Sequence, residues 1–257
     1  MAEVYRALDL STAAHVALKV LRQHLDGHDP AARQRFAREA DVQALLRHRN
    51  VAALLATGVT AEDQPYLVVE LLRGKSLRGV LQSEGAVSVR RAASYAYQAL
   101  QGLAAVHEAG VLHRDLKPAN IMLEPAPGPI ERVVLIDFGF ATFEGGARLT
   151  RQGAIVGSLT YIAPEQLRGE TIDHRSDLYS IGVVFYELLM GRPPFVAADH
   201  FELVDKQLND DPPPLDPALP RELDLVLARA LAKYPDDRFP DAPAMATALQ
   251  EAVRDLR

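Results

Sequence analysis

The chain has 257 residues, of which 48% are hydrophobic and 24% charged, an ordinary balance for a globular protein with one large domain or two small lobes. Its formal net charge of −6 argues against a nucleic-acid partner or an anionic membrane surface, and the absence of cysteine excludes disulfides and thiolate metal sites. The N-terminus carries charges where a signal peptide has an apolar stretch.

The sequence pattern of residues 1–72 predicts mainly strands and one helix. In residues 15–21 a period of two places Ala17 and Lys19 on one face of a strand, opposite Val16, Leu18 and Val20. Asp29-Pro30 is typical of a helix start, so we expect a helix to about residue 47 with an apolar side made of Phe36, Ala40, Ala44 and Leu45. Further strands are expected at residues 51–58 and 66–70.

After a break at Arg73-Gly74 the pattern predicts helices, at residues 89–109, 176–190, 223–232 and 244–256. Residues 178–190 form the longest apolar run, but Ser180, Gly182 and Glu187 interrupt it. This favours a buried core helix over a membrane segment. The expected architecture is an α+β fold in which a small β-rich lobe, residues 1–72, is hinged near residues 70–74 to a larger helical lobe, residues 73–257.

The octapeptide at residues 113–120, HRDLKPAN, carries the strongest chemical signal. Phosphoryl transfer needs a carboxylate that accepts the proton of a substrate hydroxyl and an amide oxygen that holds Mg²⁺. Asp115 and Asn120 supply these two groups five residues apart, with Lys117 between them. The alternative is a charged surface loop between a helix and a strand.

Three further residues belong to the same chemistry. Asp137 begins an Asp-Phe-Gly sequence after an apolar strand, and there it would chelate the Mg²⁺ that bridges the ATP phosphates. Lys19 shares a strand face with the small Ala17, as the wall of a nucleotide cleft requires, and Glu39 on the next helix is its expected partner. Taken alone, each motif has an alternative interpretation: Asp-Phe-Gly is also a common turn sequence, and Lys19 is also consistent with a solvated lysine on an edge strand.

In order and spacing these motifs resemble the eukaryotic-type (Hanks-type) protein kinase family, most closely its bacterial serine/threonine branch, over nearly the whole chain. The resemblance implies a bilobal fold with an antiparallel N-lobe, and transfer of the γ-phosphate of ATP to Ser or Thr hydroxyls of protein substrates. The implied cofactors are ATP and Mg²⁺, with Mn²⁺ as an alternative ion. The implied adenine pocket consists of Val4, Ala17, Met122 and Ile136, with Val69 as gatekeeper and the backbones of Glu70 and Leu72 on the adenine edge.

The resemblance also implies an activation segment that runs from Asp137 to Ala163-Pro164-Glu165. Within it, a phosphate on Thr150 would pair with Arg114, although Thr150 is equally an ordinary loop threonine. Ser158 is expected to hydrogen-bond the two catalytic-loop residues Asp115 and Lys117. Ser158 and Lys117 both indicate Ser/Thr rather than Tyr specificity.

Three residues are expected to be structural. Asp177, at the start of the buried helix, should accept backbone N–H bonds from the catalytic loop and fix its shape. Arg238 is expected to form a buried ion pair with Glu165. Neither interaction would touch a substrate.

The N-terminus departs from the family pattern, because the first strand and the glycine-rich phosphate loop should precede Val4. Met1 resembles an internal residue of that loop, and Ala2 stands where its third glycine would be. Three explanations stay open: a native start upstream, a true truncation, or a kinase-fold interaction module without catalysis. A small-molecule phosphotransferase is a further rival. The expected location is the cytoplasm, with the cytoplasmic part of a longer membrane-anchored protein as an alternative.

Overall fold

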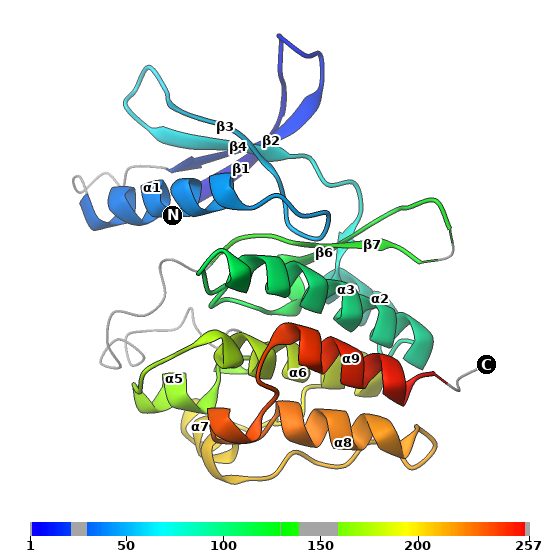
Figure 1. Ribbon diagram of the computed structural model, residues 1–257. Coiled ribbons are helices and arrows are strands. Elements are labelled where there is room, and N and C mark those ends of the chain that lie inside the picture. The colour runs from blue at the N-terminus through cyan, green and yellow to red at the C-terminus, as the bar shows by residue number, and fades with distance from the viewer. Residues whose placement is uncertain (1, 22–29, 129, 139–158, 255–257) are drawn as a thin grey trace.

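A computed structural model describes residues 2–21, 30–128, 130–138 and 159–254 of the chain. Figure 1 shows the two expected parts: a sheet with helix α1 at one end of the molecule and a group of helices at the other. The α+β architecture predicted from the sequence is therefore confirmed, and its β-rich part is antiparallel.

The first sheet has the strand order β1-β2-β4-β3, and all of its neighbours are antiparallel. Its strands are β1 (Ala2–Leu8), β2 (His15–Leu21), β3 (Leu54–Val59) and β4 (Pro65–Glu70). The register sets Val4 of β1 opposite Lys19 of β2, and Ala17 of β2 opposite Val69 of β4. Three adjacent strands thus bring together residues that the sequence assigns to one nucleotide pocket.

Two details of the predicted N-terminal part are wrong. The strand expected from residue 51 begins at Leu54, because Val51 makes only an isolated bridge to Leu135. On α1 (Pro30–Leu45), the predicted apolar residue Leu45 is 70% exposed, and Ala44 is exposed as well. Phe36 and Gln43 are buried instead. Leu45 lies two residues beyond Gln43, which turns it by about 200° around the helix and away from the sheet.

Residues 71–74 join the first sheet to a second, three-stranded sheet with the order β5-β6-β7. Its strands are β5 (Lys75–Ser76), β6 (Ile121–Glu124) and β7 (Arg132–Leu135). A Cβ atom at Gly74 would lie 1.8 Å from the Leu123 carbonyl oxygen. Only glycine therefore allows the linker to approach β6 closely enough for β5 to pair with it.

The larger part is built around α6 (His174–Met190), in which nearly every residue from Ser176 to Leu189 is buried. The sequence prediction of a core helix is confirmed, and within the described ranges no helix has the length and apolarity needed to cross a membrane. α6 packs between α3 and α8. The other helices and helical turns are α2 (Leu77–Glu84), α3 (Val89–Glu108), η1 (Pro118–Asn120), α5 (Pro164–Arg168), α7 (His200–Asn209), α8 (Arg221–Ala230), η2 (Pro235–Asp237) and α9 (Ala242–Ala252).

Candidate active site

Three polar residues of the loop before β6 form one hydrogen-bonded group. Lys117 Nζ lies 2.9 and 2.8 Å from the two carboxylate oxygens of Asp115. Asn120 Nδ2 donates to the Asp115 carbonyl oxygen and to its Oδ2, both at 2.8 Å. A carboxylate held from two sides has a fixed direction, which is what a group that must meet an incoming hydroxyl requires.

Asp177 at the start of α6 holds the backbone of this loop. Its Oδ2 accepts the N–H of His113 at 2.8 Å, and its Oδ1 accepts the N–H of Arg114 at 2.9 Å. These are the predicted bonds, and they hold Arg114 at a φ of +65°, a left-handed conformation that non-glycine residues seldom adopt. Asp177 therefore compensates for a strained turn that aims the following residue, Asp115.

His107 of α3 is a partner of Asp177 that the sequence does not predict. Its Nε2 lies 2.8 Å from Asp177 Oδ2. Burial by itself would raise the pKa of Asp177, but the hydrogen bond and charge of His107 and the neighbouring N–H groups hold that pKa below its usual range. The two residues are 70 positions apart, so no local pattern in the sequence points to this contact.

Replacing Asp177 by alanine is expected to lower kcat by about 10²-fold, because the loop that carries Asp115 loses its two backbone bonds and the reacting group is misplaced. The substitution should also lower the free energy of unfolding, because each of the two N–H groups that is left buried without a partner costs about 1–3 kcal/mol. Steady-state kinetics and a thermal unfolding curve measure the two effects on the same protein.

The matched control is Asp173→Ala, which removes the N-cap of the same helix, where the side chain accepts from Arg175 N at 2.8 Å. We expect it to cost about 1 kcal/mol of stability and to leave kcat unchanged. A wild-type kcat in Asp177→Ala would show that Asp177 does not set the geometry of the catalytic loop.

Two candidate oxygen ligands for a cation, those of Asn120 and Asp137, lie at the end of the β6-β7 pair. Ile121 pairs with Leu135, and Ile136 N donates to the Asn120 carbonyl at 3.0 Å. Asn120 and Asp137 are therefore brought beside each other from positions 17 residues apart in the chain. An amide oxygen and a half-exposed carboxylate suit Mg²⁺, which takes one or two carboxylates together with substrate phosphates and water. The described residues hold no group of three or more His, Cys, Asp and Glu side chains that would bind a metal by themselves.

Lys19 reaches this candidate cation site from β2. Its Nζ lies 2.9 Å from Asp137 Oδ1. Asp137 has a φ of +53°, the second strained non-glycine backbone in the site after that of Arg114. Glu39 lies in α1, but its side chain is outside the described part of the structure, so its pairing with Lys19 stays a prediction.

The predicted regulatory residues Thr150 and Ser158 also lie outside the described residues. The contacts expected between Thr150 and Arg114, and between Ser158 and the catalytic loop, therefore stay predictions. The described chain resumes at Leu159, just before the sequence Ala163-Pro164-Glu165.

A cavity of about 200 Å³ opens beside Lys19 and Asp137 between the two sheets. It brings together residues of the predicted nucleotide pocket from five separate segments, namely Val4, Ala17, Lys19, Val69, Glu70, Leu72, Met122, Ile136 and Asp137. Three further lining residues, Gln43, Ala52 and Leu71, are absent from the sequence prediction. Its walls are mostly apolar and a few polar side chains, among them Lys19 and Asp137, also line it, as expected for a site that holds a flat base and a phosphate chain.

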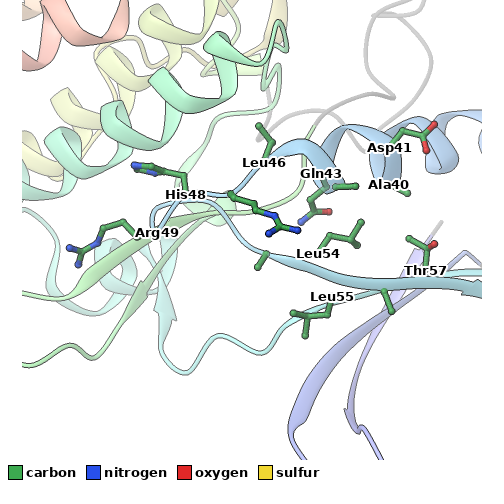
Figure 2. A pocket seen from close by; sticks show the side chains of 13 residues that line it. Ala40, Asp41, Gln43, Leu46, His48, Arg49, Leu54, Leu55 and Thr57 are labelled. Carbon is green, nitrogen blue, oxygen red and sulfur yellow. The ribbon is translucent and has the colours of Figure 1, made fainter. Parts of the chain in front are cut away.

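A larger cavity of about 650 Å³ lies between the C-terminal half of α1 and β3. Figure 2 shows Asp41 and Thr57 at one end of it, His48 and Arg49 at the other, and Gln43 extending from α1 toward β3. It contains none of the candidate catalytic residues, so its volume does not make it the active site. Gln43 lines both cavities, and its Nε2 donates to the Ala52 carbonyl at 3.1 Å.

The predicted ion pair between Arg238 and Glu165 is present and fully buried. The guanidinium donates two bonds to the carboxylate, at 2.8 and 2.7 Å, and the side chains are 0% and 1% exposed. Ser176 Oγ donates to the same carboxylate at 2.6 Å. Burial alone would raise the pKa of Glu165, but Arg238 and Ser176 hold it below its usual value, so the group stays ionised.

Comparison with known proteins agrees with this geometry. Residues 1–251 match the protein kinase domain family. The chain is 39% identical over 253 residues to the serine/threonine-protein kinase PknB of Mycolicibacterium smegmatis, covering 95% of the chain and 40% of that protein. It is 37% identical to a probable serine/threonine-protein kinase PknB of Corynebacterium glutamicum, covering 99% of the chain and 40% of that protein. The chain thus spans about two fifths of the length of these curated relatives.

Among solved structures, the kinase domain of PknI from Mycobacterium tuberculosis superposes with a TM-score of 0.73 at 27% identity, covering 98% of this chain and 91% of that one. The two lobes, the buried anchor of the loop at residues 113–120 and the cavity between the sheets are those of the protein kinase fold. The chain belongs to the protein kinase family, and its curated relatives are bacterial serine/threonine kinases.

Proposed function

We propose that this chain is a serine/threonine protein kinase domain, a transferase that moves the γ-phosphate of ATP to Ser or Thr hydroxyls of proteins. The observation that carries the proposal is the hydrogen-bonded group of Asp115, Lys117 and Asn120, which Ile136 N joins through the Asn120 carbonyl to the cavity that Lys19 and Asp137 line. The proposed domain comprises residues 1–257, with lobes at residues 1–72 and 73–257 that meet at this cavity.

In the proposed complex the adenine ring lies between the apolar side chains of Ala17, Val69 and Met122. The N–H of Glu70 already donates to the Ala53 carbonyl at 3.0 Å. Adenine recognition is therefore assigned to the Glu70 carbonyl and the Leu72 N–H, which suit the amino group and a ring nitrogen of the base. Lys19 supplies a positive charge to the α- and β-phosphates.

The metal site is assigned to Asn120 and Asp137, whose oxygen donors fit Mg²⁺ and also Mn²⁺. When bound, the ion would neutralise charge on the phosphates. Asp137 also accepts from Lys19, so the same carboxylate links the cation site to the lysine that faces the phosphate chain. Asn120 holds Asp115 through its amide nitrogen, which leaves its amide oxygen for the ion.

In the transfer step the acceptor hydroxyl oxygen attacks the γ-phosphorus, and its proton passes to the Asp115 carboxylate. The bond between the γ-phosphorus and the β,γ-bridging oxygen breaks, and ADP leaves with both electrons of that bond. Lys117 lies within 3 Å of Asp115 and stabilises the negative charge that develops where acceptor and phosphate meet.

The proposed partners are proteins with Ser or Thr acceptors in the cytoplasm, where ATP is available. The domain would act there alone or as the cytoplasmic part of a longer membrane-anchored protein. Phosphorylation of Thr150 is the proposed activating event, because a phosphate there would pair with the Arg114 guanidinium and order the segment. Ser158 is proposed to orient Asp115 and Lys117 toward the acceptor.

Addition of Mg·ATP is expected to raise the unfolding temperature of the chain by about 5–10 °C. Ligand at a hundredfold excess over Kd stabilises the folded state by about 2.7 kcal/mol, and each kcal/mol is worth about 2–4 °C for a domain of this size. Differential scanning fluorimetry with Mg·ATP, and with AMP without metal as the matched control, measures the shift.

The same preparation is then given radiolabelled ATP and a generic basic acceptor protein. Transfer of label to serine or threonine supports the proposal. A chain that shows neither a thermal shift at millimolar Mg·ATP nor transfer of label would instead be a kinase-fold interaction module.

A further inference from the structure

Gln207 on the inner face of α7 is completely buried, although glutamine is usually exposed. Its amide nitrogen Nε2 lies 2.9 Å from the Leu159 carbonyl oxygen, 3.0 Å from that of Thr160 and 3.4 Å from that of Ile162. Its two N–H groups thus serve three carbonyls of one short segment, which lies 45 to 48 positions earlier in the chain. A single side chain therefore fixes the path of residues 159–162.

The chemistry of this contact admits only a hydrogen-bond donor. If the amide were turned over, its oxygen would face three carbonyl oxygens. In the orientation that satisfies the carbonyls, Gln207 Oε1 is buried and has no hydrogen-bond partner among the described residues. Burial of an amide oxygen without a partner is unfavourable. An apolar side chain at position 207 would not have to bury an amide oxygen without a partner. The advantage of glutamine at this position is therefore its three hydrogen bonds to residues 159–162.

The segment that Gln207 holds lies beside the catalytic loop. At the start of α6, Asp177 binds the backbone of that loop, as described above. One turn further along the same helix, Ser180 Oγ donates to the Tyr161 carbonyl at 2.7 Å. Residues three apart on a helix share a face and lie about 5 Å from each other. The loop with Asp115 and the segment around Tyr161 are therefore held next to each other by one helix end.

α7 is itself fixed to the core, so it is a firm support for the segment. Leu203 of α7 packs with Leu159 and Phe195 in one buried apolar cluster. At the other end of the helix, Lys233 Nζ donates to the Gln207 carbonyl at 2.9 Å and lies 4.4 Å from the centre of the Phe195 ring. Gln207 is thus anchored through its backbone while its side chain holds the segment.

We infer that Gln207 is a positioning residue for the protein acceptor: by holding residues 159–162 beside Asp115, it shapes the surface on which the peptide around the reacting Ser or Thr lies. The inference rests on the proposed function. An acceptor hydroxyl must approach the Asp115 carboxylate, and residues 159–162 form a turn, closed by Ile162 N donating to the Leu159 carbonyl at 3.1 Å, that is held beside the loop with Asp115. Gln207 touches neither nucleotide nor acceptor, so its loss should affect use of the acceptor and spare use of ATP.

The test compares the wild-type chain with Gln207→Met, which has a similar volume and no donor, and with Gln207→His, which keeps one. Gln207→Met is expected to lower kcat/KM for a basic acceptor protein by about tenfold or more, since small misplacements at a reacting centre cost up to about 10²-fold. KM for ATP and the slow hydrolysis of ATP by water should change by less than about twofold, because neither uses the acceptor surface. Gln207→His should recover part of the loss.

The matched control is Gln98→Met in α3. Gln98 also bonds backbone: its Nε2 donates to the Glu131 carbonyl at 3.0 Å and its Oε1 accepts from Val133 N at 3.1 Å, and neither bond involves residues 159–162. This variant should lose thermal stability and keep wild-type kcat/KM for the acceptor protein. If the two variants have equal Tm but different kcat/KM for the acceptor protein, the difference is due to the acceptor surface and not to a less stable fold.

Two results overturn the inference. One is an unchanged kcat/KM for the acceptor in Gln207→Met. The other is a parallel loss of acceptor phosphorylation and ATP hydrolysis, which would mean that Gln207 only supports the fold. Both are read against an active wild-type chain. If the wild type transfers no phosphate at all, the proposed function fails instead, so the two failures are distinguishable.

Discussion

Replacing Asp115 by asparagine is expected to lower the rate of phosphoryl transfer by about 10²–10⁴-fold, the usual contribution of a general base. The amide has the shape of the carboxylate and can still contact Lys117 and Asn120, but it cannot accept the hydroxyl proton at neutral pH. Transfer of radiolabel from ATP to a basic acceptor protein, followed over time, measures the rate.

The fold and the nucleotide pocket should survive this substitution, so the stabilisation by Mg·ATP should stay within about 2 °C of that of the wild type. Asp236→Asn is the matched control, because Asp236 is an exposed aspartate that pairs with Arg175 on the surface. It should retain wild-type activity. If Asp115→Asn transferred phosphate at the wild-type rate, another group would have to accept the proton and the proposed mechanism would be wrong.

Breaking the buried pair between Arg238 and Glu165 is expected to be the most destabilising single change in the helical part. Removing one member leaves the other charge buried without its partner, which typically costs about 3–5 kcal/mol. For a domain of this size that corresponds to a fall of about 6–20 °C in Tm for Arg238→Met or Glu165→Gln. Thermal unfolding followed by circular dichroism measures the change.

The double variant Arg238→Met/Glu165→Gln should lose less than the sum of the two single losses, because no unpaired charge stays in the interior. Arg254→Met is the comparison for an exposed pair: the ion pair of Arg254 with Glu251 is solvent-accessible, so its loss should cost less than about 1 kcal/mol. Additive losses in the double variant, or a single loss as small as that of Arg254→Met, would contradict the idea that the two buried charges act as one unit.

Local signals in the sequence predicted most of the secondary structure. The strand at residues 15–21 has its predicted bounds, and the core helix α6 begins two residues before the expected position because Asp173 caps it. Apolar periodicity in the sequence predicted the wrong buried side for a helix whose burial depends on its packing partner. On α1 the apolar residue Leu45 lies on the exposed side, while the polar Gln43 is buried, because the position of the sheet and not the residue type decides which side faces inward.

The candidate site also contains residues that the sequence predicted and residues that only the structure revealed. Asp115, Lys117, Asn120 and Asp137 follow from short motifs, since each motif places its functional groups within a few residues of one another. His107 could not be predicted, because its role depends on a contact between α3 and α6 that no local spacing encodes. The same holds for Gln43 in the wall of the proposed nucleotide cavity, which lies there only because α1 packs on the first sheet.

The sequence by itself thus determined the kinase family and the order of the elements, and it predicted the residues that are proposed to carry the chemistry, because these properties depend on residue type and short spacing. Only the tertiary structure decided which distant groups support them. His107 reaches Asp177 across 70 positions and Gln207 reaches residues 159–162 across more than 40. A hydrogen bond needs its two atoms within about 3 Å of each other, and for residues this far apart that separation is set by the packing of α3, α6 and α7.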